Sequence, residues 1–164
     1  MTTTTIRNGR LDLQLRGARA VLSGRIDDSC QLGELAGQLP PGDVVIDTAG
    51  VTFVNSIGMR EWGRFIRALR ERGAVTLEAV ADVLMAQMNL ISEFIGAVRI
   101  TSFHASYVCP ACGYEASLLI DAIAHAAALR QLQAPALPCP ECGKPMELAD
   151  FPERYLSIFR SARA

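Results

Sequence analysis

Two Cys-x-x-Cys pairs limit the possible folds of this chain more than any other feature. Cys109 and Cys112 form the first pair, and Cys139 and Cys142 form the second. Two thiolates three positions apart can bind one ion, and the glycine that follows each pair allows the tight turn that such a loop needs. Four thiolates are a ligand set that Zn²⁺ prefers in tetrahedral sites. The sequence therefore predicts that the two pairs meet around one zinc ion.

The predicted zinc ion is structural rather than catalytic. A catalytic zinc keeps one coordination position for water and usually has histidine or carboxylate ligands, whereas four cysteines close the shell. His104 and His125 are candidates to replace a cysteine ligand and are otherwise surface or linker residues. A redox function for either Cys-x-x-Cys pair is the competing interpretation. Cys30 stands alone near a predicted helix start, where we expect a small buried side chain.

Composition indicates the compartment and the classes of partner. The 164 residues are 50% hydrophobic and 20% charged, which suits one ordinary domain or a small domain with an added module. The formal net charge is -1, so nucleic acid is not an expected partner. No apolar run approaches the roughly 20 residues that span a bilayer, and the polar threonine run after Met1 does not resemble a secretory signal. With the paired cysteines, these features predict a soluble, cytoplasmic protein.

Hydrophobic periodicity predicts two strands and a helix at the beginning of the chain. Leu11, Leu13 and Leu15 alternate with polar residues, and a second extended run covers residues 18–26. Two antiparallel strands joined by a tight turn are therefore expected. Apolar residues then recur at helical spacing over residues 32–39, and the prolines that follow end this helix.

The middle of the chain predicts a buried strand, a turn and a long amphipathic helix. Residues 44–46 are almost continuously apolar, as in a strand that helices cover on at least one face. The helix begins near Ser56 and ends at Gly73. One of its faces carries the apolar residues Met59, Trp62, Phe65, Ile66 and Leu69. Another face carries Arg60, Arg64 and Arg67, so one side of the helix is expected in the core.

Two further strands complete the first part of the chain. One is predicted over residues 74–80 and the other over residues 97–101, and a helix lies between them. The core stripe of that helix consists of Leu84, Met88, Ile91 and Ile95. Strands that alternate with helices predict an α/β fold, in which helices pack on a mixed, mostly parallel sheet. We expect this domain to cover residues 1–102.

The remaining residues, 103–164, predict a small module around the two cysteine pairs. The segment between the pairs holds an alternating, strand-like stretch over residues 114–120 and an alanine-rich, helix-like stretch over residues 121–133. This part resembles a zinc ribbon with an insertion. The chain then continues into an apolar segment with Leu148, Phe151, Tyr155, Leu156, Ile158 and Phe159. We expect it to pack against the module or the sheet, and the alternative is a partner or homodimer interface.

Residues 44–59 carry the pattern that points to a function. Asn55 and Ser56 stand where the strand and turn lead into the long helix, as a cap and a first-turn residue do. Backbone N–H groups and the positive end of the helix dipole meet there, which favours a phosphate or an acidic group of a partner. Asp47 and Phe53 precede this polar pair.

This arrangement resembles the signature loop of the STAS domain, the fold of the anti-sigma factor antagonists. The matching positions are Asp47, Phe53, Asn55, Ser56, Ile57, Gly58 and Met59, and residues 21–27 resemble the second strand of that family. The resemblance implies a STAS-like fold over residues 1–102. In the family, a partner kinase phosphorylates a hydroxyl residue at the position of Ile57. Isoleucine has no hydroxyl group, so the usual switch is absent, and Ser56 is an alternative phosphosite.

The resemblance also implies a partner-binding surface on the loop and its helix. Its residues are Asn55, Ser56, Ile57, Gly58, Arg60, Arg64 and Arg67. The arginines would meet an acidic patch of a regulatory protein. The alternative is a solvated helix face, on which Glu71 pairs with Arg67 four residues before it.

No enzyme constellation is evident in the sequence. It has no glycine-rich phosphate loop and no Ser-His-Asp arrangement with supporting spacing. We therefore expect a non-enzymatic signalling adaptor, bacterial by its resemblance, that binds an anti-sigma factor, a kinase-like protein or another regulatory partner. The alternative is an accessory or scaffold subunit of a larger complex, such as a transporter ATPase or a multi-subunit assembly.

Overall fold

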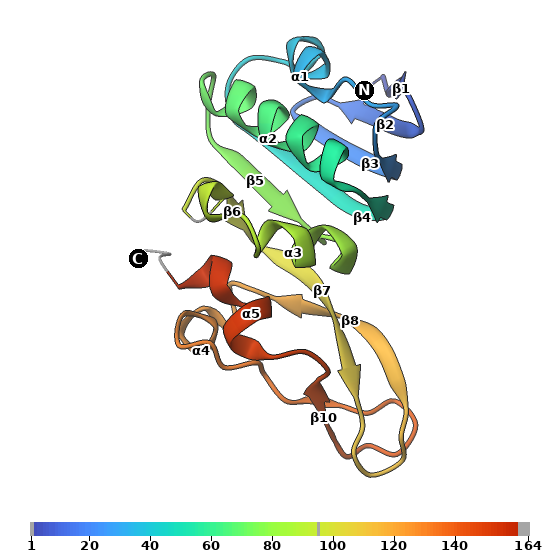
Figure 1. The fold of residues 1–164 in the computed structure, drawn as a ribbon, viewed down its shortest axis with the longest axis vertical. Coiled ribbons are helices and arrows are strands. Elements are labelled where there is room, and N and C mark those ends of the chain that lie inside the picture. The colour runs from blue at the N-terminus through green and yellow to red at the C-terminus, as the bar shows by residue number, and fades with distance from the viewer. Residues whose placement is uncertain (1, 95, 161–164) are drawn as a thin grey trace.

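The computed structural model describes residues 2–94 and 96–160, which form two sheets one after the other along the chain (Figure 1). The first sheet has six strands in the order β1-β2-β3-β4-β5-β6, and the second has four in the order β8-β7-β10-β9. The first sheet is mixed and carries helices, so the predicted α/β class is confirmed. No helix among the residues described is both long enough and apolar enough to cross a membrane.

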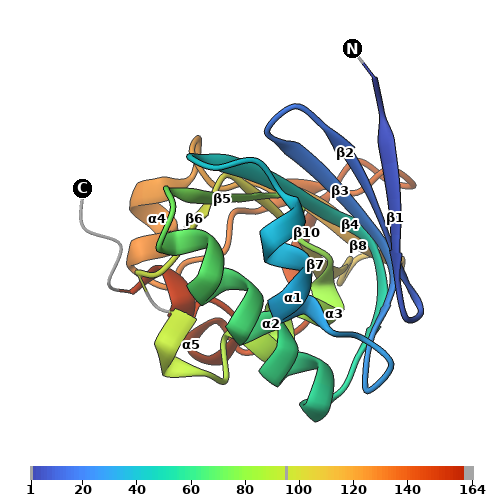
Figure 2. The same ribbon diagram turned by 90° about the horizontal axis from the view of Figure 1, so that it is seen from above.

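The first part of the chain builds the six-stranded sheet. Its elements are β1 (Thr4–Asn8), β2 (Leu11–Arg16), β3 (Arg19–Ile26), α1 (Leu32–Leu35), η1 (Ala36–Gln38), β4 (Val44–Val54), α2 (Ser56–Arg70), β5 (Val75–Glu78), α3 (Asp82–Met88), η2 (Ser92–Phe94) and β6 (Arg99–Ile100). Strands β1 to β3 are antiparallel, and β3 to β6 pair in parallel. Right-handed crossovers between sequential parallel strands bring the connecting helices to one face. Figure 2 shows α1 and α2 together on that face.

Alternating burial along β4 shows how the helices cover the sheet. Val44, Ile46 and Thr48 are buried, whereas Val45 and Asp47 on the opposite face are half-buried. Helix α2 lies on this sheet and buries the predicted apolar residues, which are Met59, Trp62, Phe65, Ile66 and Leu69. The predicted amphipathic helix is therefore confirmed.

Two strands of the first sheet differ from the predictions. Strand β1 is an addition to the predicted set, and it pairs with β2 at the sheet edge, where its mostly exposed side chains need no apolar alternation. Strand β4 continues to Val54, whereas we predicted a strand over residues 44–46 followed by a turn. The prediction was wrong because two register irregularities against β3 let the longer strand stay paired.

From α2 onward, the helices and strands of the first part are shorter than predicted. Helix α2 ends at Arg70 rather than at Gly73, and α3 ends at Met88. The predicted stripe of that helix therefore divides, with Ile91 beyond α3 and Ile95 outside the described residues. Strands β5 and β6 are also shorter than the predicted ranges.

The second part of the chain builds an antiparallel sheet and two short helices. Its elements are β7 (Ser102–Val108), β8 (Glu115–Asp121), α4 (Ala126–Arg130), β9 (Leu137–Pro138), β10 (Pro145–Leu148), α5 (Pro152–Tyr155) and η3 (Ser157–Phe159). The predicted strand over residues 114–120 is confirmed as β8. The predicted helical stretch over residues 121–133 contains only α4. The Asp121 carboxylate accepts the N–H groups of Ile123 and Ala124, which holds a turn where that helix was expected to begin.

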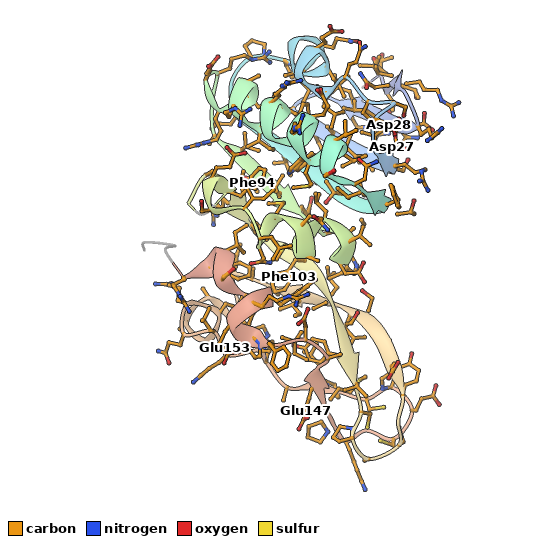
Figure 3. The ribbon with its side chains drawn as sticks, in the orientation of Figure 1. Asp27, Asp28, Phe94, Phe103, Glu147 and Glu153 are labelled. Carbon is orange, nitrogen blue, oxygen red and sulfur yellow. The ribbon has the colours of Figure 1, made fainter. Side chains whose placement is uncertain are left out.

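Strand β7 joins the two sheets. Its residue Phe103 is fully buried and lies at the junction of the two parts (Figure 3). The Phe103 and Phe159 ring centroids are 5.1 Å apart. The backbone of β7 also contacts the first part, because the His104 N–H donates to the Val80 carbonyl at 2.7 Å. The two parts therefore share one continuous hydrophobic core.

The apolar segment near the end of the described chain closes this junction. Tyr155, Leu156, Ile158 and Phe159 are buried, so the expected packing is confirmed for them, whereas Phe151 is 73% exposed. The Tyr155 hydroxyl donates to the His104 carbonyl at 2.6 Å. On the other side, the Ile158 N–H donates to the Asn89 side chain at 2.8 Å. The segment thus contacts both parts of the chain.

Gly58 permits a close contact between the first turn of α2 and the end of β3. A Cβ atom at this position would lie 2.0 Å from the carbonyl oxygen of Ile26 and 2.4 Å from its carbonyl carbon. Both are backbone atoms, so neither can rotate away. Any side chain at residue 58 would push the start of α2 off the sheet.

We expect Gly58→Ala to lower the free energy of unfolding by about 2 kcal/mol, because the helix must shift to relieve the overlap. Urea unfolding followed by circular dichroism measures this change. Gly37→Ala is the matched control, since a Cβ atom there meets nothing within 4 Å. A loss of stability of equal size in the two variants would contradict the close contact.

Candidate metal centre and partner surface

The two cysteine pairs lie in turns at one end of the second sheet. Cys109 and Cys112 lie between β7 and β8, and Cys139 and Cys142 lie between β9 and β10. Strand β10 pairs with both β7 and β9, so the pairing of the sheet brings the two turns together. Strand pairing therefore brings together two cysteine pairs that lie far apart in the sequence.

The two turns have the same backbone geometry. In the first turn, the Cys109 N–H donates to the Tyr114 carbonyl and the Gly113 N–H donates to the Cys109 carbonyl, each at 2.8 Å. The second turn repeats both bonds at the same lengths. Gly113 and Gly143 have φ angles of 79° and 75°, in the left-handed region that favours glycine. The glycine after each pair therefore has the conformational function that the sequence predicted.

The four cysteine sulfur atoms converge on one point. All four lie within 4.8 Å of one another. The Cys109 and Cys142 sulfurs are 3.5 Å apart, and the Cys112 and Cys139 sulfurs are 3.7 Å apart. A tetrahedral ion with metal–sulfur bonds of about 2.3 Å requires sulfur–sulfur edges of about 3.8 Å. The four side chains therefore fit a single tetrahedral metal ion.

The pKa values of Cys109 and Cys112 shift in opposite directions. The backbone N–H of Cys112 leads the interactions that lower the pKa of Cys109 from 9.0 to about 7. At Cys112, the backbone N–H of Tyr114 acts in the same direction, but burial and the neighbouring cysteine side chains raise the pKa to about 12. Once one thiol of the cluster is ionised, its negative charge opposes the ionisation of the neighbouring thiols. A bound cation would remove that repulsion.

The other cysteine and the two histidines lie outside the cluster. Cys30 is buried, as predicted, and its thiol donates to the Arg25 carbonyl at 3.2 Å. His104 lies on β7 at the junction, with its ring nitrogen Nδ1 3.3 Å from the Val80 carbonyl oxygen. His125 is the residue before α4. The cluster consists of the four paired cysteines.

The start of α2 has the predicted cap. The side-chain oxygen of Asn55 accepts a hydrogen bond from the Gly58 N–H at 2.8 Å. The backbone carbonyl of Asn55 accepts one from the Met59 N–H at 2.9 Å. Ser56 is exposed, and Ile57 is 49% exposed. Gly58 is buried against β3. Of the predicted partner-binding residues in the loop, Ser56 and Ile57 thus face solvent.

The three predicted partner-binding arginines are all exposed along α2. Arg64 pairs with Glu61 at 2.6 Å, and Arg67 pairs with Glu93 at 3.0 Å. Glu93 of the neighbouring η2, rather than Glu71, supplies the carboxylate that pairs with Arg67. Arg60 forms no ion pair within the part of the chain that the structure describes. Arg60 is therefore the cation here that could meet a partner without breaking an ion pair.

A buried carboxylate, that of Asp27, belongs to a residue whose backbone lies beside the first turn of α2. Asp27 follows β3, is 1% exposed, and lies with Asp28 at that end of the first part (Figure 3). Its carboxylate accepts from the Ser29 backbone and hydroxyl, from Arg10 at 3.0 Å and from Arg25 at 3.3 Å. These interactions hold the pKa of Asp27 well below its ordinary value of 3.8. Asp27 therefore stays ionised wherever the protein is folded near neutral pH.

Arg10 and Arg25 are site-adjacent residues that the sequence analysis missed. The Arg25 guanidinium lies 3.8 Å from the centre of the Phe53 ring, close to the loop that leads into α2. Arg25 and Asp27 are two positions apart at the end of one strand, and this spacing indicates that they share a side. Arg10 comes from the preceding turn, so only the pairing of β2 with β3 brings it to Asp27.

We expect metal content to follow the four clustered cysteines. The purified chain should hold one metal ion, measured by inductively coupled plasma mass spectrometry. Cys109→Ser and Cys142→Ser should each reduce the content to near zero, because each removes a thiolate ligand. Cys30→Ser is the control and should keep the ion, since Cys30 lies outside the cluster. Full retention of metal in both cluster variants would contradict this assignment.

We also expect Asp27 to contribute to acid sensitivity. Its pKa is lower in the folded chain than the ordinary 3.8, so its contribution to stability is present above that value and is lost as the pH falls below it. Asp27→Asn should reduce the fall in urea midpoint between about pH 5 and pH 3. The exposed neighbour Asp28 offers a matched control, Asp28→Asn, which should retain the full fall. Identical pH profiles for the two variants would count against this network.

Comparison with known proteins adds no assignment. No protein-family model matches the chain, and no curated protein matches it in sequence. The candidate sites of the chain are its four-cysteine cluster and the exposed start of α2.

Proposed function

We propose that this protein is a non-enzymatic regulatory adaptor that binds a protein partner through the start and outer face of α2. The observation that carries the proposal is the exposure of Ser56 and Ile57 at a capped helix start, with exposed arginines along the same helix. Ser56 and Ile57 lie at the positive end of the helix dipole, with the exposed arginines of α2 beside them. This positively charged surface suits a partner that presents an acidic patch. The resemblance to the STAS domain supports this choice of surface.

Ile57 would leave this adaptor either locked in one binding state or controlled by something other than phosphorylation at this position. Phosphorylation adds almost two negative charges and three acceptor oxygens to a hydroxyl residue, and isoleucine cannot accept it. Regulation would then come from the partner, from the metal module or from Ser56, whose hydroxyl is exposed. The lack of a hydroxyl group at residue 57 distinguishes the chain from the STAS proteins that are switched by phosphorylation at this position.

We propose that the ion at the four cysteines is Zn²⁺ and that it has a structural function. Four clustered thiolates, two of whose sulfur–sulfur distances are close to a tetrahedral edge, suit zinc and would fill all four of its coordination positions. The turns that they clamp lie at the end of a sheet in which β9 has only two residues. Zinc would supply folding free energy that such short strands cannot supply. We therefore describe residues 103–164 as a zinc-ribbon-like module beside a STAS-like domain.

The compartment and the excluded partners form part of the same proposal. Free cysteines that cluster around a metal suit a reducing compartment, so we place the adaptor in the cytoplasm. The near balance of 16 basic and 17 acidic residues argues for a protein partner rather than nucleic acid.

A second candidate is a scaffold subunit of a larger complex, in which the module supplies another docking surface. Leu119 and Phe151, on the module, are 55% and 73% exposed, which favours a second contact site. Light scattering after size-exclusion chromatography of the native assembly separates the candidates. A stable assembly of high mass supports the scaffold, and a small exchanging heterodimer supports the adaptor. A homodimer of this chain alone would contradict both.

We expect substitutions on α2 to weaken partner capture. The tagged chain would be purified from the native host, and bound proteins would be quantified by mass spectrometry. Ile57→Glu and Arg60→Glu should each reduce the captured partner by about tenfold, because they place negative charge against an acidic patch. Arg154→Glu, on α5 in the other part of the molecule, is the control and should change nothing (Figure 1). Partners retained at wild-type levels by both α2 variants would refute this surface.

A further inference from the structure

A cavity of about 890 Å³ opens beside the outer strand of the first sheet. Its walls come from β6, from the last turn of α2, from α4 and from η3, so both parts of the chain contribute. Figures 1 and 2 show β6 and α4 on the same side of the molecule. The cavity is distinct from the four-cysteine cluster and from the exposed start of α2.

Three arginines line this cavity, and none of the described residues that line it is acidic. Arg70 lies at the end of α2, Arg99 lies on β6, and Arg130 lies at the end of α4. Among residues 2–94 and 96–160, none of the three forms an ion pair, whereas five other arginines, among them Arg64 and Arg67, pair with nearby carboxylates at 3.3 Å or less. Three cations from separate elements therefore line one hollow, and no carboxylate of the described residues is paired with them.

The rest of the lining is mainly apolar. Val98 and Ile100 contribute from the sheet edge, and Ile158 and Phe159 contribute from η3. Ile123 also lines the cavity and is 56% exposed, which leaves apolar surface available to a ligand. The volume lies within the range of about 300–1,000 Å³ that is typical of small-molecule sites.

We propose that this cavity binds an amphipathic small molecule, with an apolar body and a carboxylate, phosphate or sulfonate head group. The apolar body would lie against the residues of β6 and η3. Guanidinium groups bind planar or tetrahedral acidic groups with paired hydrogen bonds, which the three arginines can supply. This site adds a ligand to the proposed adaptor and does not depend on its partner surface.

The geometry favours a small molecule over a peptide at this edge. A peptide that extends a sheet needs a long unpaired strand, and β6 has only two residues. An extended polyanion needs a track of cations along a surface, whereas these three surround a hollow. The occupant is therefore compact, acidic at one end and apolar at the other.

Calorimetric titration of the full, metal-loaded chain with decanoate below its micelle concentration tests the proposal. Decanoate should bind about tenfold more tightly than decan-1-ol, which has the same chain without the charge. Arg99→Gln and Arg130→Gln should each weaken decanoate binding about tenfold. Arg154→Gln should leave it unchanged. Equal affinity for the acid and the alcohol would overturn the proposal.

A second pair of variants tests the location of the ligand. Ala126→Trp fills the cavity from α4, whereas Ala127→Trp places the same side chain at an exposed neighbour outside the lining. Only the first should abolish decanoate binding, and circular dichroism and metal content would confirm that both variants fold. Loss of binding in both variants, or in neither, would overturn the assignment of this cavity.

The source of the head group can be separated with vesicles. Decanoate binding in free solution supports a free ligand. Sedimentation with phosphatidylglycerol vesicles but not with phosphatidylcholine vesicles, lost in Arg99→Gln, supports the same acidic group on a lipid. Binding of an acidic peptide through these arginines, without binding to either amphiphile, would overturn the proposal in favour of a protein partner.

Discussion

The burial of Phe103 at the junction is the contact on which the relation between the two sheets depends. Its side chain is fully buried and lies against Phe159, while the backbone beside it pairs with Val80. The Asn89 side chain accepts a hydrogen bond from the Ile158 N–H, which fixes the apolar segment of α5 and η3 to the first part. Aromatic burial of this kind contributes several kcal/mol, about 3–5 when such a side chain is truncated. The wall that η3 gives to the arginine-lined cavity exists because these contacts hold.

The module is held in two chemically different ways at opposite ends of β7. At the junction end, apolar packing and backbone bonds hold it to the first sheet. At the other end, four clustered thiols lie between the turns of short strands, where the proposed metal ion would hold the turns together. Within the described residues of the module, the sheet has four strands and the longest helix, α4, has five residues. This division explains how a module with little core of its own keeps a defined position.

The sequence predicted the parts of the structure that have local signals. The cysteine turns, the two faces of α2 and strand β8 all follow from spacing within one element. It missed β1, which has little apolar alternation because it lies at an exposed edge. It also missed the cavity, because Arg70, Arg99 and Arg130 lie far apart in sequence and meet only through the fold. The cavity forms through strand pairing and through the packing of the two parts at the junction. Neither of these can be predicted from residue spacing within one element.

The position of α5 and η3 after all other described elements affects how the protein folds during synthesis. Phe159 packs against Phe103, and Ser157 and Ile158 donate hydrogen bonds to Asn89, yet these residues are made after every other element of the described structure. The first sheet can pair early, since its neighbours are also sequential in the chain. The junction cannot close until this segment has emerged from the ribosome. A nascent chain that stalls before that point would present an uncovered aromatic surface to chaperones and proteases.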